Sequence, residues 1–275
     1  MCLSMLKSFF SAFSSIQVTP LSGAYKFVSC PQPVKDTGCT YCELPQFPSN
    51  RQIDYERQLR NSKVALYKHA LILHGLPDHK AWPRRFEMAP DSIISTLNAL
   101  KRQYTDGYHP SLISMTSLQE PANVDCQLVG LYPDGLVIHV PNSRLKDFTR
   151  AFLDGKGGED SKEKAALRET FKTRKLLKDY VLVCGHYKRD IRCGLLGPLV
   201  KAEFEKAFQL AQVPKEKVGL GYISHIGGHS FAANVLIFKK NGDVIWYGRV
   251  EQRNVQGIVL KTVLGNEIIE ELYRG

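Results

Sequence analysis

The chain has 275 residues, enough for two domains of ordinary size, and its 43% hydrophobic and 23% charged residues are typical of a globular protein. No apolar run approaches the ~20 residues that a membrane-spanning helix needs, so an integral membrane protein is not expected. The formal net charge of +10 favours acidic partners. The basic residues are spread along the chain without interleaved aromatic side chains, and this pattern argues against a nucleic-acid-binding protein.

Residues 1–29 have the composition of a leader. They contain no acidic residue, are rich in serine, and include a Phe- and Leu-rich stretch from Leu3 to Phe13. Mitochondrial targeting segments share these properties but are usually also rich in Arg, whereas the first Arg of this chain is Arg51. The segment is therefore predicted to be either a mitochondrial targeting segment or a cytosolic leader.

The cysteines favour metal or redox chemistry over disulfide staples. Their number is odd, the chain is too long to need staples, and the N-terminal segment lacks the compact apolar core and cleavage site of a secretory signal. A reducing compartment is therefore expected. The seven cysteines are Cys2, Cys30, Cys39, Cys42, Cys126, Cys184 and Cys193.

One Cys-x-x-Cys pair, Cys39-Thr-Tyr-Cys42, lies in a proline-rich stretch that is expected to be extended. Such a pair can act as a redox dithiol or contribute two ligands to zinc. A complete zinc site needs two more ligands at suitable spacing, and only Cys30 lies nearby. Cys39 and Cys42 are therefore candidates for a redox dithiol, with a zinc pair or inert loop cysteines as the alternatives.

Residues 30–155 are predicted to form a first α/β unit. Apolar side chains at helical spacing follow Asp91, which can cap a helix. The sequence Pro133-Asp134-Gly135 between two apolar runs predicts a hairpin. In chain order we expect a strand at 70–73, a helix at 91–104, strands at 112–118, 127–132 and 136–140, and a helix at 143–153.

Residues 156–175 are rich in Glu, Lys and Arg, and they predict a charged, exposed linker with a solvated helix. Residues 176–275 then repeat the order of the first unit in outline. Pro198 suits the first turn of a helix, and Asn241-Gly242 marks a second hairpin. The expected elements are a strand at 180–184, a helix at 197–211, strands at 218–223, 231–238 and 244–250, and a helix at 255–272. The repeated order predicts two thioredoxin-like α/β domains.

Only the second unit carries a Cys/His set, in which Cys184 and Cys193 are followed by His225 and His229. Zinc fingers place their cysteines two to four residues apart, and the Cys184–Cys193 spacing is wider. A [2Fe–2S] cluster suits the set better, because two thiolates can hold one iron and two imidazoles the other. The glycines between the histidines predict a loop rather than a helix. Buried apolar cysteines with loop-capping histidines remain the alternative.

A Rieske centre would use Cys-x-His twice, and the sequence offers this pattern only at Cys184-Gly-His186. His186 is therefore expected either to donate to the residues around the site or to lie on the surface. The helix predicted from Gly197 would direct its positive end toward Cys193 and stabilise a thiolate there. Lys188, Arg189 and Arg192 would add positive charge at the same end.

The sequence around these residues resembles the sucrase/ferredoxin-like family of thioredoxin-like [2Fe–2S] proteins, and within it the fungal altered-inheritance-of-mitochondria branch. The Cys-x8-Cys and His-Ile-Gly-Gly-His motifs are the most specific part of the resemblance, which covers nearly the whole chain. The matching stretches are CGHYKRDIRCG at 184–194, SHIGGHSFAANVLIF at 224–238, WYGRV at 246–250, ELYRG at 271–275, CPQP at 30–33, CTYC at 39–42 and HALILHG at 69–75.

The resemblance implies a [2Fe–2S] cluster with Cys184, Cys193, His225 and His229 as ligands, and a role in electron transfer or thiol redox control. It also implies a mitochondrial location, in the matrix or the intermembrane space, with the cytosol as the alternative. We expect an electron carrier rather than a stand-alone enzyme, with protein partners as electron donor and acceptor. A thiol–disulfide oxidoreductase using Cys39 and Cys42, and a structural zinc protein, are the competing hypotheses.

Overall fold

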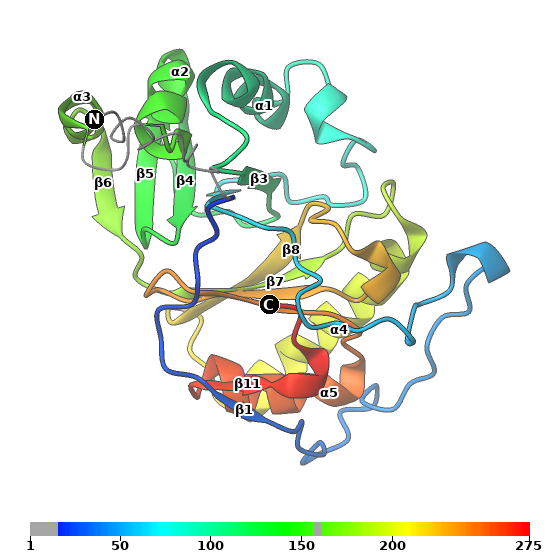
Figure 1. Cartoon of the computed structure of the whole chain (residues 1–275). Helices are drawn as coiled ribbons and strands as arrows, with labels where there is room; N and C mark the ends of the chain where they lie inside the picture. Colours follow the sequence, from blue (N-terminus) through cyan, green and yellow to red (C-terminus); the bar gives the residue numbers. More distant parts are fainter. Residues whose placement is uncertain (1–15, 157–160) are drawn as a thin grey trace, which may run out of the picture.

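The computed structural model describes residues 16–156 and 161–275, so the Leu3–Phe13 stretch lies outside the described residues. Figure 1 shows a first sheet with its helices above a second sheet, and α4 (Ile191–Leu210) and α5 (Gln252–Ile258) on the far side of the second sheet. Within the described ranges, no helix combines the length and apolar character needed to cross a bilayer.

The first sheet has five strands in the order β3-β2-β4-β5-β6. The two parallel strands β2 and β3 are joined by α1 (Ile93–Tyr104), and every other pairing is antiparallel. A short α2 and a π-helical turn, η4, follow β5. The bounds are β2 (Lys68–Ile72), β3 (Ser111–Met115), β4 (Cys126–Tyr132), β5 (Leu136–Pro141), α2 (Leu145–Phe148), η4 (Thr149–Leu153) and β6 (Lys172–Lys175).

The second sheet repeats this arrangement with four strands in the order β10-β9-β7-β8. The central strand β7 pairs in parallel with β8 across α4 and antiparallel with β9. All six residues of β7 are buried, as expected of a strand covered on both faces. The bounds are β7 (Asp179–Cys184), β8 (Val218–Ile223), β9 (Val235–Phe238) and β10 (Val244–Tyr247). A βαβ unit followed by ββα in both sheets confirms the predicted α/β, thioredoxin-like architecture.

The start of α4 differs from its prediction. The helix begins at Ile191 rather than near Gly197, because the Asp190 side chain accepts the backbone N–H of Arg192 and caps it. Pro198 therefore lies inside the helix rather than in its first turn. The cap of α1 also differs from its prediction. Asp91 was the predicted cap, but it has a left-handed φ of +57°, and Ser92 occupies the cap position instead.

The end of the chain also differs from its prediction. The helix expected at 255–272 ends at Val263, and it consists of α5 and the π-helical turn η6 (Val259–Val263). The chain then forms β11 (Glu267–Ile269), which pairs in parallel with β1 (Lys26–Val28). The strand expected at 231–238 begins only at Val235.

Part of the predicted leader belongs to the fold. Besides β1, the backbone N–H groups of Ser22 and Gly23 donate to the buried Asp243 carboxylate at 2.6 and 2.9 Å. Figure 1 shows this segment descending along the second sheet to β11. The described residues 16–29 are thus held by long-range contacts.

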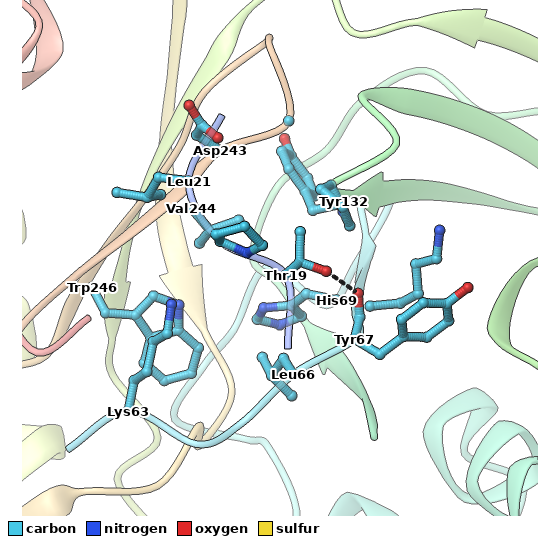
Figure 2. Close-up of a pocket in the computed structure, with 14 residues that line it drawn as sticks. Thr19, Leu21, Lys63, Leu66, Tyr67, His69, Tyr132, Asp243, Val244 and Trp246 are labelled. Atoms are coloured by element: carbon cyan, nitrogen blue, oxygen red, sulfur yellow. Dashed lines mark hydrogen bonds between the residues drawn. The ribbon is translucent and has the colours of Figure 1, made fainter. Parts of the chain in front are cut away.

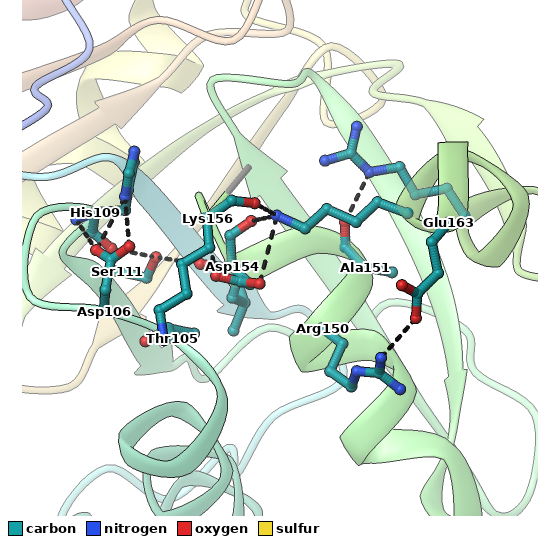
Figure 3. Close-up of polar contacts among 12 residues, drawn as sticks. Thr105, Asp106, His109, Ser111, Arg150, Ala151, Asp154, Lys156 and Glu163 are labelled. Atoms are coloured by element: carbon teal, nitrogen blue, oxygen red, sulfur yellow. Dashed lines mark hydrogen bonds and ion pairs between the residues drawn. The ribbon is translucent and has the colours of Figure 1, made fainter. Parts of the chain in front are cut away.

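The segment predicted as a linker contributes α3 (Lys162–Glu169) and β6. Side-chain contacts tie α3 to the first unit. Arg150 pairs with Glu163 (Figure 3), at 2.7 Å, and Lys164 donates to the carbonyl of Asp154 at 2.8 Å. The strand β6 extends the first sheet beside β5. All of its side chains are exposed and most are charged, as is common for a protected sheet edge.

The two sheets share a core and an edge. A core cluster of the second unit includes residues of β2 and β4, and the ring of Tyr132 lies 4.8 Å from that of Phe238. Figure 2 shows the cavity of about 50 Å³ at this interface, into which His69 and Trp246 point. At the edge, the backbone N–H of Ser224 donates to the carbonyl of Met115 at 2.8 Å. The loop after β8 therefore begins beside β3.

Candidate metal centre

The two buried cysteines come from adjoining ends of β7 and α4. Cys184 is the last residue of the strand, and Cys193 lies in the first turn of the helix. Each is 1% exposed. A Cβ atom on Gly197 would lie 2.7 Å from the carbonyl oxygen of Cys184, so glycine allows the helix to approach the strand this closely. Because α4 begins at Ile191 and not near Gly197, Cys193 lies inside the first turn of the helix and does not precede the helix.

The two histidines lie on the loop that follows β8, as their glycine-rich spacing predicts. Gly227 and Gly228 both have left-handed φ angles, +88° and +68°, and they turn the chain between His225 and His229. The ring centroids of the two histidines are 5.2 Å apart. The loop thus presents two imidazoles side by side.

Three of the four predicted ligands converge. The ligand atoms of Cys184, Cys193 and His225 all lie within 4.8 Å of one another. His229 lies outside this group of three and faces His225, and its Nε2 is 3.8 Å from an Asp190 carboxylate oxygen. Two thiols thus lie close to one imidazole, that of His225, and the second imidazole, that of His229, lies beside the first.

The nitrogen atoms of the histidines indicate what the site can hold. The Nδ1 atoms of both His225 and His229 are buried and have no hydrogen-bond partner among the described residues. Buried polar side-chain atoms are normally paired, so two unpaired nitrogens beside two buried thiols need an explanation. Ligation of a metal through Nδ1 supplies one, because neutral imidazole nitrogen and thiolate sulfur are both metal donors. The donor set fits the iron–sulfur cluster that the sequence predicts.

One of the two sulfur atoms, that of Cys184, is biased toward ionisation, whereas hydrogen bonding with Cys184 and burial raise the pKa of Cys193. Hydrogen bonding from the Cys193 thiol lowers the pKa of Cys184 well below its usual range, with a further contribution from His225, although burial opposes this shift. The backbone N–H of His186 adds to the effect. Cys184 is therefore prepared as a thiolate, the form that binds metal.

Asp190 links the helix terminus to the histidine loop. Burial acts to raise its pKa, but hydrogen bonds from Arg192 outweigh burial and lower it. Arg192 donates to the carboxylate through Nε and Nη2 at 2.9 and 3.0 Å. Arg192 was predicted to add positive charge near Cys193, but Asp190 neutralises that charge. Residue spacing did not single out Asp190, although an Asp directly before an apolar helix start is a common cap.

His186 is buried and not a surface residue. Its Nε2 lies 2.8 Å from the Pro83 carbonyl oxygen, and its Nδ1 accepts the backbone N–H of His225 at 3.1 Å. The rings of Trp82 and Phe86 each lie 5.6 Å from its ring. His186 therefore fixes the backbone of a candidate ligand, and the first unit fixes His186. The spacing of residues in the sequence did not indicate that Trp82, Pro83 and Phe86 would contact His186.

The Cys-x-x-Cys pair lies in a separate loop. The hydroxyl groups of Thr37 and Thr40 donate to Glu203 of α4 at 2.5 and 2.9 Å and hold this loop in place. Cys42 is exposed, and hydrogen bonding with Cys39 raises its pKa. Within residues 16–156 and 161–275, no further His, Cys, Asp or Glu joins this pair in a three-ligand group.

Comparisons with known proteins show the family of the chain. The family model described as sucrase/ferredoxin-like matches residues 59–275. The chain belongs to the sucrase/ferredoxin-like family. Relatives in this family include "Altered inheritance of mitochondria protein 32" of Meyerozyma guilliermondii, which is 38% identical and aligns over 90% of this chain and 94% of its own length. The protein of the same name from Clavispora lusitaniae is 35% identical, again over 90% of this chain and 94% of its own length.

Among solved structures, the thioredoxin-like [2Fe–2S] ferredoxin from Aquifex aeolicus is similar to part of the chain. It is 22% identical, and the match covers 36% of this chain and 97% of the ferredoxin with a TM-score of 0.30. The Cys55Ser variant of that ferredoxin gives 20% identity, covers 35% of this chain and 98% of the ferredoxin, and has a TM-score of 0.31.

Proposed function

We propose that this sucrase/ferredoxin-like chain binds a [2Fe–2S] cluster through Cys184, Cys193, His225 and His229 and acts as an electron carrier. The observation that carries the proposal is the pair of buried, unpartnered Nδ1 atoms next to two buried thiols. The family description, which includes ferredoxin-like proteins, agrees with it. The cluster would supply one-electron chemistry at a potential raised by its two neutral imidazole ligands.

The geometry favours a two-iron centre over a single zinc ion. Zinc in a structural site is held tetrahedrally by four donors around one point. Here the two sulfurs and one imidazole form a compact group, and His229 lies beside His225 rather than within that group. The proposed centre would place the two thiolates on one iron and the two imidazoles on the other.

The chain's own residues orient the donors and control protons. His186 holds the backbone of His225, and Asp190 lies 3.8 Å from Nε2 of His229. If Nδ1 binds the metal, Nε2 would carry the ring proton, and the Asp190 carboxylate would favour its retention. Proton release from this nitrogen would therefore be coupled to the redox state of the centre.

The imidazole side is the accessible side. Both cysteines are buried, whereas His229 has a side chain that is 45% exposed. His225 lines a cavity of about 220 Å³ that also includes Arg84 and Arg189. We therefore propose that partner proteins donate and accept electrons at the histidines, and that acidic surfaces on these partners match the arginines.

Thiol–disulfide exchange at Cys39 and Cys42 is a second candidate function. It is favoured by the exposure of Cys42 and by the contact between the two thiols. In such a reaction, the two thiols would reduce a partner disulfide to two thiols and form one Cys39–Cys42 disulfide.

The names of the relatives link this family to mitochondria. We propose a mitochondrial location for this chain, in the matrix or the intermembrane space, with the cytosol as the alternative.

The full-length protein purified under anaerobic conditions tests the main proposal. We expect visible cluster absorption, about two irons and two sulfides per chain, and an electron paramagnetic resonance signal after reduction. A His225→Cys variant should keep the cluster but have a lower potential with a weaker pH dependence. A colourless, zinc-loaded wild-type protein would contradict the proposal.

A further inference from the structure

Arg274 is a buried cation without a carboxylate partner. The residue is 1% exposed, and within residues 16–156 and 161–275 it forms no ion pair with an Asp or Glu. The other buried arginine near the site, Arg192, pairs with Asp190 at 2.9 Å. A buried charge is costly unless a neighbouring opposite charge offsets it. The counter-charge of Arg274 must therefore come from another kind of group.

The anionic groups that favour the charged form of Arg274 are cysteines. Burial lowers its pKa to about 10, while the charges of Cys184 and Cys193 act to raise it. The guanidinium remains protonated at neutral pH. The buried positive charge is thus close enough to both cysteines for their charges to favour its protonated form.

Hydrogen bonds connect Arg274 to both halves of the site through Asn234. Nη1 of Arg274 donates to the side-chain oxygen of Asn234 at 2.6 Å, and the amide nitrogen of Asn234 donates to the Gly228 carbonyl at 3.0 Å. The backbone carbonyl of Asn234 accepts the N–H of Cys184 at 2.9 Å. The pair of Arg274 and Asn234 therefore fixes the end of β7 and the histidine loop relative to each other.

The guanidinium itself is held from several sides. Its Nε and Nη2 donate to the Ser62 hydroxyl and carbonyl oxygens at 3.1 and 2.8 Å. It lies over the ring of Phe231 at 5.4 Å. A Cβ atom on Gly228 would approach Nη2 to 2.3 Å, so only glycine leaves room for the cation behind the loop. The charge is consequently fixed in position rather than mobile.

We propose that Arg274 is a positioning residue that places a fixed positive charge beside the proposed centre, where Asn234 links it to the backbone of Cys184 and to the Gly227-Gly228 loop. This inference rests on the proposed cluster. An electron added to the centre makes it more negative by one charge, and a nearby fixed cation stabilises that reduced state. Arg274 should therefore raise the reduction potential.

The test is the reduction potential of the cluster-loaded full-length protein and of its Arg274→Gln and Arg274→Lys variants. We expect Arg274→Gln to keep the iron content but to have a lower potential, because the cation is lost. Arg274→Lys should restore most of the potential, since it keeps the charge. As a control, Arg150→Gln removes an exposed arginine of the first unit that pairs with Glu163, and should leave the potential unchanged.

A second variant covers the case in which Arg274→Gln does not fold. Asn234→Asp keeps the side-chain size and places a carboxylate on the guanidinium, which offsets its charge and should also lower the potential. An unchanged potential in a folded, cluster-loaded Arg274→Gln or Asn234→Asp protein would overturn the inference. A wild-type protein without a cluster would instead refute the proposed function, so the two failures are distinguishable.

Discussion

The two α/β units have the same strand order, but their strand ends carry different chemistry. The second unit has Cys184 at the end of β7 and His225 after β8. In the first unit the chain continues from β2 into Leu73, and Thr116 and Ser117 follow β3. The Thr116 hydroxyl donates to the Ile72 carbonyl at 2.6 Å and so satisfies backbone instead of offering a metal ligand.

The unit without the candidate ligands supports the unit that has them. In the first unit, the loop between β2 and α1 contacts the site from outside: His79 lies 2.9 Å from the Gly185 carbonyl oxygen, and the Pro83 carbonyl meets His186 at 2.8 Å. The two copies of the fold therefore differ in their tasks. One copy holds the proposed ligands, and the other contacts residues beside them.

The largest effect should come from removing a ligand. Cys184→Ser should abolish cluster binding, because serine does not provide the soft thiolate that iron–sulfur clusters require. Cys126→Ser changes a cysteine at the start of β4 in the first unit and should retain the full iron content. Iron and sulfide analysis measures both variants. Equal iron content in the two would contradict the proposed division between the units.

The supporting role of the first unit can be tested at Trp82, which is 1% exposed and packs against His186. Trp82→Ala should lower the free energy of unfolding by about 3–5 kcal/mol, because it opens a large cavity. Leu177→Ala, at a side chain that is 74% exposed, should change it by less than about 0.5 kcal/mol. Urea unfolding followed by circular dichroism measures both. If Trp82→Ala also loses iron, the two units are coupled.

A buried histidine of the first unit, His69, should make the free energy of unfolding depend on pH. His69 in the first unit points into the interface cavity, and burial lowers its pKa to about 3 (Figure 2). The unfolded chain binds a proton near pH 6.5 while the folded chain does not, so stability should fall as the pH decreases below about 6.5. This residue alone gives a slope of up to about 1.4 kcal/mol per pH unit.

Urea unfolding at pH 7 and pH 5 measures this dependence. His69→Gln, which can still hydrogen bond to Ser114, should have a shallower pH dependence than the wild type. His74→Gln changes an exposed histidine and should leave the dependence unchanged. Identical pH dependence in the wild type and His69→Gln would show that His69 is not the group responsible.

The smallest effect is expected at the edge of the first unit. The Arg150–Glu163 pair shown in Figure 3 has side chains that are 42% and 75% exposed. Exposed ion pairs contribute little, so Arg150→Ala should lower the free energy of unfolding by about 0.2–1 kcal/mol. High salt should remove most of the difference. A loss above about 2 kcal/mol would mean that α3 is more closely integrated into the first unit than its charged surface suggests.

Local patterns predicted most of the strands. The strand predicted at 218–223 coincides with β8, and the turn residues 133–135 do join β4 and β5. The edge strand β6 was missed because Lys172–Lys175 contains no apolar residue, and only pairing with β5 makes it a strand. β11 was predicted as helix because its two isoleucines also fit helical spacing. Its partner β1 is far away in the sequence, so the pairing has no local sign.

The candidate ligands could be selected from spacing and from the family resemblance, and the structure brings three of them together. Their surroundings could not be predicted in the same way. Asn234 and Arg274 join the site from positions far apart in the sequence, and Pro83 comes from the other unit. Such contacts depend on how the two sheets pack, and sequence periodicity carries no information about that packing.

The pairing of β1 with β11 limits how a leader can be processed. Removal of all of residues 1–29 would take away Lys26–Val28 and leave the backbone of Glu267–Ile269 without its parallel partner. It would also remove Ser22 and Gly23, whose N–H groups donate hydrogen bonds to the buried Asp243 carboxylate. A maturation protease that leaves this fold intact must therefore cut before Ser22, and a mature protein beginning near residue 30 would be destabilised.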